Sequence, residues 1–266
     1  MSVITLLTDF GTDDEYVGLM KGVILSINPS ATIVDVTHGI RPHDIAQAAY
    51  TIYAGYHYFP AQTVHLIVVD PGVGTQRRLL ALRLEDHVFV APDNGVLSLL
   101  LGHKHISSLN QITNPKYFRA AVSRTFHGRD IIAPVGAHIT NGVDVRELGP
   151  AMDVSTAVCL DQLEARCTET GELKGEVVAI DHFGNLITNI KSEQLTECLP
   201  AGPRANTRIR LGSRLIGGLV ETYASMPAET PSALIGSRGY LEIAINKDNA
   251  ARFLDAQIGD DVWVVP

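Results

Sequence analysis

The chain has 266 residues, 45% of them hydrophobic and 19% charged, so it is long enough for one large domain or two modest ones and too apolar for a disordered protein. Its 21 basic and 29 acidic residues give a formal net charge of −8 without a lysine or arginine block, which argues against nucleic acid and anionic membranes as partners. No apolar run approaches the roughly 20 residues that a membrane span needs. We therefore expect a soluble enzyme or small-molecule binder.

The first half of the sequence alternates apolar strands with amphipathic helices. Strands are expected at residues 2–9, 31–36, 64–69, 79–84 and 87–91. Helices are expected between an acidic cluster (Asp13, Asp14, Glu15) that should cap the first of them and Pro29, at 44–56, at 94–101 and near 130–139. The alternation predicts a parallel sheet covered on both faces. Ligands bind outside the carboxyl ends of such strands, where Asp9 and Asp70 stand.

The pattern changes after about Gly149. Residues 150–172 are mixed and polar, which is typical of a linker. Short β-rich runs then recur at 176–180, 186–190, 207–211, 240–245 and 261–265. This pattern predicts a small antiparallel barrel or sandwich. The expected organisation is an α/β domain over residues 1–160 and a smaller β domain over 173–266.

The cysteine pattern bears on the cellular compartment of the protein. Cys159, Cys167 and Cys198 are odd in number and form no CxxC pair, and the sequence starts without a basic-plus-apolar signal segment. These features predict a protein of the reducing cytoplasm.

The segment VVDPGVGTQRR, residues 68–78, is the first candidate for chemistry. The segment lacks the third glycine of a dinucleotide-binding loop, and it also lacks the Gly-Lys-Ser/Thr of a Walker-type loop. A phosphate cradle is therefore disfavoured. A tight turn with a surface pair of Asp70 and Arg77 remains open beside an acid–base pair that does chemistry.

Two further residues of the first half suit a reaction site. His127 stands beside a glycine just before an expected helix, as an exposed acid–base group or a helix-capping residue. Asp9 ends a strand and could accept both hydroxyls of a ribose. His103 and His105 have no neighbouring carboxylate or cysteine, so no metal site is predicted.

Two turn segments of the second half suit binding. Asp181-His182-Phe183-Gly184-Asn185 and Ser237-Arg238-Gly239-Tyr240 are β-turns when each is taken alone. An asparagine side chain offers one acceptor and two donors, which suits an adenine edge. Ser237 and Arg238 would suit a carboxylate.

Together the motifs resemble one family. TDFGTDD (8–14), VVDPGVGTQRR (68–78), FHGRD (126–130), DHFGNLITNI (181–190) and SRGYLEIAIN (237–246) follow the order and spacing of the S-adenosyl-L-methionine (SAM) hydroxide adenosyltransferases, relatives of fluorinase and chlorinase. The resemblance spans essentially the whole chain. It implies a Rossmann-like α/β N-terminal domain with a parallel sheet and a smaller C-terminal antiparallel β-barrel. It also implies a homotrimer with active sites between one subunit's N-terminal domain and its neighbour's C-terminal domain.

The resemblance further implies hydrolysis of SAM to adenosine and methionine without a metal or other cofactor. Asp70, Arg77 and His127 match the Asp–Arg–His trio that marks the hydrolytic branch. Halogenating members have a tyrosine at the position of Asp70, and fluorinating members have a halide-binding serine at that of Gly128. Water is therefore the expected nucleophile.

Matching positions also imply binding roles. Asp9 corresponds to the ribose-binding aspartate, and Asn185 to the adenine contact. Asp14 and Asp181 correspond to residues near the methionine amine. Ser237 and Arg238 correspond to the end that holds the methionine carboxylate.

Three alternatives stay open. A non-catalytic sensor of adenosine or SAM would keep the fold and the pocket. A halide-dependent 5′-halo-adenosine synthase would use the same substrate, SAM, with a halide in place of water. A nicotinamide-dependent dehydrogenase is opposed by the incomplete glycine pattern.

Overall fold

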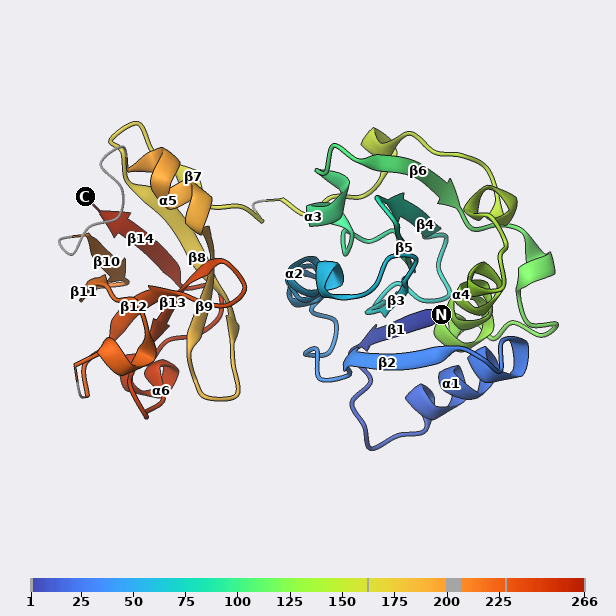
Figure 1. Ribbon diagram of the computed structural model, residues 1–266, viewed down its shortest axis with the longest axis horizontal. Helices are drawn as coiled ribbons and strands as arrows, with labels where there is room; N and C mark the ends of the chain where they lie inside the picture. Colours follow the sequence, from blue (N-terminus) through green and yellow to red (C-terminus); the bar gives the residue numbers. More distant parts are fainter. Residues whose placement is uncertain (1, 162, 200–206, 228, 266) are drawn as a thin grey trace. The chain divides into compact units, whose positions relative to one another are not determined.

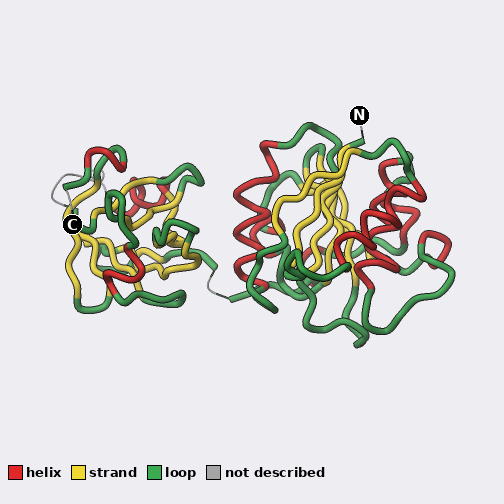
Figure 2. Tube along the Cα trace, turned by 90° about the horizontal axis from the view of Figure 1, so that it is seen from below, coloured by secondary structure: helices red, strands yellow, loops and turns green. Residues whose placement is uncertain are grey.

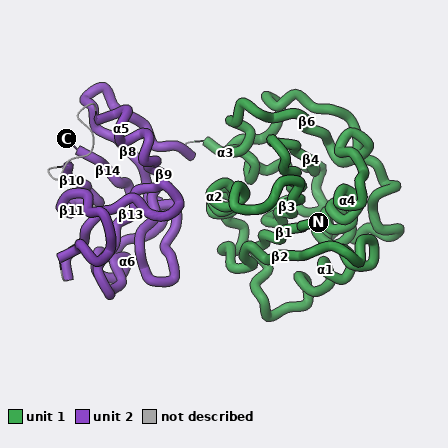
Figure 3. Tube along the Cα trace, viewed as in Figure 1, with its two compact units in different colours: residues 1–161 green, residues 162–266 purple. Residues whose placement is uncertain are grey.

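The computed structural model describes residues 2–161, 163–199, 207–227 and 229–265. The chain forms two compact units, residues 1–161 and 162–266 (Figure 3). Their boundary falls inside the stretch 150–172 expected as a linker. Ala151 pairs with a strand of the first unit and Ala157 is buried in that unit's core, so the start of this stretch is packed. The domain bounds of 1–160 and 173–266 stay predictions.

The first unit is built on a six-stranded sheet in the order β2-β1-β3-β5-β4-β6 (Figure 1). Its strands are β1 (Val3–Thr8), β2 (Thr32–Thr37), β3 (Val64–Val68), β4 (Leu79–Leu84), β5 (His87–Pro92) and β6 (Ile106–Gln111). Strands β2, β1, β3 and β5 run parallel, as predicted, whereas β4 is antiparallel to both β5 and β6. The reversal arises because only two residues join β4 to β5, and a parallel crossover needs a dozen or more.

Helices cover both faces of this sheet (Figure 2). The α-helices are α1 (Tyr16–Ile27), α2 (Ile45–Gly55), α3 (Ser98–Leu101) and α4 (Ala133–Thr140). Short 3₁₀ turns are η1 (Tyr56–Tyr58), η2 (Pro115–Tyr117), η4 (Val145–Leu148) and η5 (Val154–Thr156), and η3 (Gly128–Ile132) is a π-helical turn. Along β1 the side chains alternate, so Leu6 packs in the core with α1 and α4, and Leu7 in the core with α2 and α3.

Two sequence expectations about these helices need correction. The expected helix at 94–101 is helical only at 98–101. The acidic cluster does not cap α1, because its N-cap residue Glu15 already has helical backbone angles and makes no side-chain capping bond. A capping side chain needs a non-helical backbone at that position, as Asp44 has at the start of α2, where it accepts the backbone N–H of Gln47.

The strand order creates a crevice. From β1 the chain moves to β2 on one side, and β3 then joins β1 on the other side. The direction of winding therefore reverses between β1 and β3, and crossover chains diverge there at the carboxyl ends of the strands. Asp9 directly follows β1, and Asp70 follows β3 after Val69.

The second unit is a β-barrel with the strand order β14-β10-β11-β12-β13-β9-β8-β7, in which β14 also pairs with β8 and closes seven strands. The strands are β7 (Arg166–Cys167), β8 (Leu173–Ile180), β9 (Leu186–Lys191), β10 (Arg208–Leu211), β11 (Arg214–Leu219), β12 (Ser232–Ile235), β13 (Tyr240–Ala244) and β14 (Asp261–Val265). Helices α5 (Ser192–Cys198) and α6 (Ala250–Leu254) and the 3₁₀ turn η6 (Tyr223–Ser225) complete the unit.

The predicted barrel is confirmed, with one exception to its antiparallel pairing. Strands β11 and β12 run parallel, because residues 220–231, which include η6, return the chain to the end where β11 began. The side chains of Leu241 and Ile243 on β13 fill the interior of the barrel.

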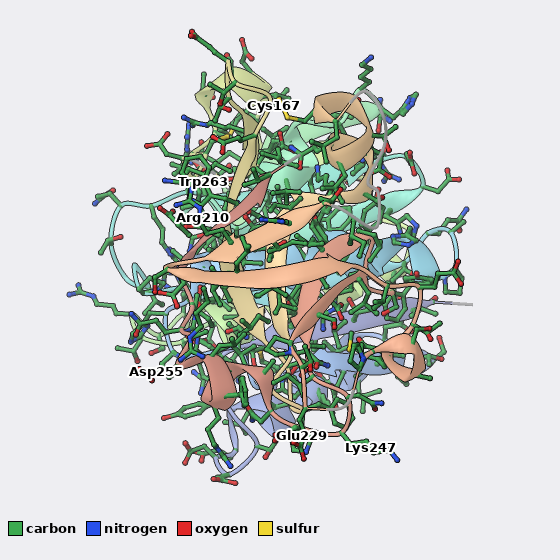
Figure 4. All side chains as sticks on the ribbon, turned by 90° about the vertical axis from the view of Figure 1, so that its left-hand side faces the viewer. Cys167, Arg210, Glu229, Lys247, Asp255 and Trp263 are labelled. Carbon is green, nitrogen blue, oxygen red and sulfur yellow. A yellow bond between two sulfur atoms is a disulfide. The ribbon has the colours of Figure 1, made fainter. Side chains whose placement is uncertain are left out.

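A disulfide joins Cys167 of β7 to Cys198 of α5 (Figure 4), and Cys159 is free and exposed. The expectation of a reducing compartment rested partly on cysteines without a pairing pattern, and the bonded pair removes that support. Within the described part of the chain, no helix combines the length and apolar character needed to cross a bilayer.

Candidate active site

Asp70 and Arg77 meet just beyond the carboxyl end of β3. Nε of Arg77 donates to both carboxylate oxygens of Asp70, at 2.6 and 2.8 Å, and Nη2 also bonds Oδ2. The side chain of Asp70 is only 5% exposed, and that of Arg77 is 9% exposed. The surface pair considered from the sequence is therefore ruled out, since this is a buried pair of fixed geometry.

A close contact between two loops positions this pair. Gly74 has φ +79°, and a Cβ there would lie 2.3 Å from the carbonyl oxygen of Arg124. Only glycine fits, so the 68–78 loop can press against the segment that leads to His127. The backbone N–H of Val73 donates to the Asp70 carbonyl and closes the turn. Gly74 is thus required for the close packing of these two loops.

His127 completes a trio. Its Nδ1 lies 3.0 Å from Nη2 of Arg77. A guanidinium group only donates, so Nδ1 accepts and Nε2 bears the proton of the neutral ring. Burial and, next, the charge of Arg77 lower the pKa of His127, while Asp70 and Asp130 oppose them more weakly. The imidazole is therefore neutral at neutral pH.

Asp130 anchors the loop that carries His127. Its buried carboxylate accepts hydrogen bonds from Arg119, Arg129 and the backbone N–H of Ser123, at 3.2, 2.7 and 2.8 Å. Burial raises the pKa of Asp130, but these bonds outweigh it and hold the pKa below its usual value. Asp130 was not predicted as a site residue, although a charge directly before the apolar run Ile131–Val135 was a usable signal.

Asp70 and His127 border a pocket of about 530 Å³ that Asp9 also lines, whereas Arg77 is not among its lining residues. Oδ2 of Asp9 accepts the backbone N–H of His43 at 2.9 Å, and among the described residues Oδ1 receives no hydrogen bond. Phe10, Tyr16 and Phe126 form one wall, with ring centroids 5.2–5.7 Å apart. Sequence reasoning missed this wall, although Phe10 and Phe126 stand next to predicted site residues.

A second pocket, of about 730 Å³, lies in the barrel unit. Four predicted residues line it: Asp181, Asn185, Ser237 and Arg238. Oδ1 of Asp181 accepts the backbone N–H groups of Phe183 and Asn185, and Oδ2 accepts the side-chain amide of Asn185. Asp181 therefore shapes its own turn and orients the asparagine.

Sequence reasoning also missed two residues of this second pocket. The Tyr223 hydroxyl donates to Oε2 of Glu242 at 2.7 Å. Burial and then the bond to Glu242 raise the pKa of Tyr223, so the hydroxyl keeps its proton. Glu242 falls inside the SRGYLEIAIN motif, but in a strand pattern it looks like an ordinary outward-facing residue.

The structure thus gathers Asp9, Asp70, Arg77 and His127 in the first unit. Asp14 is exposed in the turn before α1 and lines neither pocket. Across the described residues, no group of three histidine, cysteine or acidic side chains is arranged to hold a metal ion.

Fold and site define an α/β protein that carries a hydrogen-bonded Asp–Arg–His trio at the switch point of its sheet and a polar pocket in a β-barrel. Residues 4–149 match the family model of the SAM hydroxide adenosyltransferase N-terminal domain, and residues 175–263 match that of the C-terminal domain. The chain therefore belongs to the SAM hydroxide adenosyltransferase family, and the resemblance inferred from the motifs is confirmed.

Similar proteins agree with this membership. Proteins named (R)-S-adenosyl-L-methionine hydrolase from Salinispora tropica and Thermus thermophilus are each 36% identical, with alignments covering 97–98% of both chains. A fluorinase from an Actinoplanes species is 31% identical over 92% of this chain and 91% of its own. The crystal structure of an uncharacterized conserved protein from Thermotoga maritima superposes with a TM-score of 0.92 at 34% identity, covering 99% of this chain and 100% of the other.

Proposed function

We propose that this protein hydrolyses SAM to adenosine and L-methionine. The observation that carries the proposal is the hydrogen-bonded Asp70–Arg77–His127 trio, of which Asp70 and His127 share a pocket with Asp9. The relatives named as SAM hydrolases are also more similar in sequence than the fluorinase. Gly128 supports water as nucleophile, since a Cβ there would lie 3.1 Å from Val68 and a serine would crowd the site.

The reaction requires a water molecule that is held in a fixed position. An oxygen–C5′ bond forms while the C5′–sulfur bond breaks, and its electron pair returns to sulfur. Methionine leaves as a neutral thioether and needs no proton or Lewis acid, and on this chemical ground we propose a metal-independent reaction. The water must stand in line with the breaking bond, about 3 Å from carbon, and must lose one proton.

Each member of the trio has a separate role toward the water molecule. We assign Asp70 as the acceptor of the water's hydrogen bond and of its proton, since carboxylate oxygens bound to Arg77 keep free lone pairs. Arg77 fixes the carboxylate. His127 presents a protonated Nε2, so in this arrangement it donates a hydrogen bond to the water oxygen and is not the base.

The remaining predicted residues would bind the substrate. Asp9 has an oxygen available for the ribose hydroxyls, Asn185 is oriented for the adenine edge, and Ser237 with Arg238 would hold the methionine carboxylate. The positions of Asp14 and Asp181 near the methionine amine stay predictions. We also propose the homotrimer with sites formed between neighbouring subunits, because each pocket contains only part of the residue set. A cytoplasmic location stays a prediction as well.

The test is incubation of the purified protein with SAM in ¹⁸O-labelled water, followed by chromatography and mass spectrometry. We expect equimolar adenosine and methionine, with the label in the adenosine 5′-hydroxyl, and no effect of a chelator. Binding without turnover would identify a sensor. Formation of 5′-halo-adenosine in chloride or fluoride would identify a halogenating enzyme, and either result would overturn the proposal.

A further inference from the structure

His38 is buried in the first unit, does not line the pocket there, and has no role in the proposed reaction. We propose that His38 is a positioning residue: it fixes the backbone on either side of Asp9 and so directs the Asp9 carboxylate toward the ribose hydroxyls of the substrate. The inference deepens the proposed function and rests on it, because the ribose in question is that of SAM.

The side chain of His38 supports the backbone beyond Asp9 through the hydroxyl of Thr8. Nδ1 of His38 lies 2.9 Å from Oγ1 of Thr8, which is fully buried at the end of β1. The same Oγ1 accepts the backbone N–H of Phe10 at 3.3 Å. Thr8 and Phe10 flank Asp9 in the chain, so this one hydroxyl ties together the residues on its two sides.

The backbone of the segment that starts at His38 adds two further supports. The carbonyl oxygen of His38 accepts the backbone N–H of Gly11 at 2.8 Å. Five residues later, the backbone N–H of His43 donates to Oδ2 of Asp9 at 2.9 Å. The segment 38–43, which follows β2, therefore holds both the loop of Asp9 and one oxygen of its carboxylate. The oxygen left for a ligand is Oδ1.

Asp35 determines which way the Thr8 hydroxyl points. Nε2 of His38 lies 3.1 Å from Oδ1 of Asp35, whose Oδ2 accepts a hydrogen bond from Lys21 at 2.6 Å. Burial raises the pKa of Asp35, but the contacts with Lys21 and His38 outweigh it and hold the pKa below its ordinary value. An ionised carboxylate cannot donate, so in the neutral ring Nε2 bears the proton and Nδ1 accepts from Thr8. The lone pairs of the Thr8 oxygen then remain for the N–H of Phe10.

A second threonine–histidine pair on the same strand provides a matched control. Oγ1 of Thr5 lies 2.7 Å from Nδ1 of His65, and both residues are fully buried. His65 in turn contacts His87 at 3.2 Å, and none of these three residues lines the pocket. Thr5 therefore makes the same kind of bond as Thr8, three residues before it and away from the loop of Asp9.

The test is calorimetric titration of the full chain with adenosine and with 2′,3′-dideoxyadenosine, which lacks the hydroxyls that Asp9 would bind. Thr8→Val keeps the shape of the side chain but removes its hydroxyl. Its affinity for adenosine should fall by roughly 10- to 100-fold, the range for one charge-assisted hydrogen bond, because the Asp9 carboxylate is no longer directed at the ribose. The affinity for the dideoxy analogue should stay within about twofold.

Conservative variants should restore binding. Thr8→Ser keeps the hydroxyl and should recover most of the affinity for adenosine. His38→Leu should reproduce Thr8→Val, whereas His38→Asn, whose amide oxygen can accept from Thr8, should fall between the two. Thr5→Val should bind adenosine like the wild-type protein, although the loss of its own buried bond should lower the melting temperature.

A double-mutant cycle shows whether Thr8 acts through Asp9. In the Asp9→Ala background, Thr8→Val should have no further effect on adenosine binding, because the carboxylate that it directs is gone. Full additivity of the two substitutions, equal weakening of both nucleosides, or wild-type affinity in either single variant would overturn the inference. The expected pattern in a protein that failed to hydrolyse SAM would overturn the proposed function alone, since adenosine binding needs no turnover.

Discussion

One arginine holds both of its neighbours in place and fixes which nitrogen of His127 bears the proton. Arg77 donates to Asp70 on one side and to Nδ1 of His127 on the other. A lysine would offer a point charge without the planar fork and could not hold both partners in this geometry. The histidine, which by its ordinary pKa is the obvious base, is therefore turned into a hydrogen-bond donor.

Substitution of the carboxylate should separate catalysis from binding. Asp70→Asn keeps the shape of the side chain but removes the proton acceptor, so adenosine release should fall by about 10²–10⁴-fold. Adenosine affinity, measured by calorimetry, should stay within about twofold. Asp9→Ala is the complementary variant and should weaken adenosine binding. Wild-type turnover in Asp70→Asn would disprove the assignment of the base.

The neutral state of His127 predicts the acid limb of the pH profile. Its pKa is lowered from 6.5 by burial and by Arg77, and protonation would place a hydrogen on Nδ1 facing the guanidinium. The arrangement should therefore persist through pH 6.5 and be lost as the pH falls through the lowered pKa. The stability it contributes is fully present above pH 6.5 and declines between 6.5 and that lowered pKa, because the unfolded chain takes up the proton first. Rates of adenosine release measured from pH 8 downward should decline only below 6.5.

The matched variant for this profile is His127→Asn, whose amide can accept from Arg77 and donate to water but does not titrate. Its residual activity should lack that acid limb. An unchanged limb in His127→Asn would assign the titration to another group.

At the scale of elements, the site depends on two loops pressed together. Gly74→Ala would introduce both an unfavourable positive φ and a contact of 2.3 Å with the Arg124 backbone. We expect loss of adenosine release together with a drop in thermal stability. Gly142→Ala shares the positive φ, at +95°, but has no atom within 4 Å, so it should cost only about 1 kcal/mol and leave activity intact. Equal activity of the two variants would contradict the role of the contact.

The Cys167–Cys198 disulfide fastens β7 to α5 across 31 residues. Closing a loop of this length should stabilise the barrel unit by about 3–4 kcal/mol through the unfolded state. Cys198→Ser should therefore lower the melting temperature of the protein, whereas Cys159→Ser, which changes the free cysteine, should not. Calorimetric scans with and without a reductant provide the measurement, and identical curves would speak against the bond.

Prediction from sequence succeeded where a pattern is local. Strong apolar runs located β1 and β3, yet β6, β7, β11 and β12 were missed. The roles that the motifs imply for Asp70, Arg77 and His127 stay predictions. Only two residues of β6 are fully buried, and β11 contains two adjacent glycines, so neither shows the alternation of a half-buried strand. The partners of Glu242 could not be predicted because Tyr223 reaches it across the parallel crossover, 19 residues away.

At the scale of the molecule, the two pockets differ in chemistry. The pocket of the first unit presents Asp9, Asp70 and His127 beside an aromatic wall. The pocket of the barrel offers amide, hydroxyl, guanidinium and carboxylate groups, which suit recognition rather than reaction. The net charge of −8 fits a cationic substrate better than a polyanion.

Barrel closure has a consequence for handling the protein. The single strand β14 bonds to both β8 and β10 and so joins the two margins of the sheet. A barrel without this strand would present two rows of unpaired backbone groups, each a template for pairing with another molecule. Removal of β14 by proteolysis, or its displacement by a bulky fusion beside it, would therefore make the protein prone to self-association.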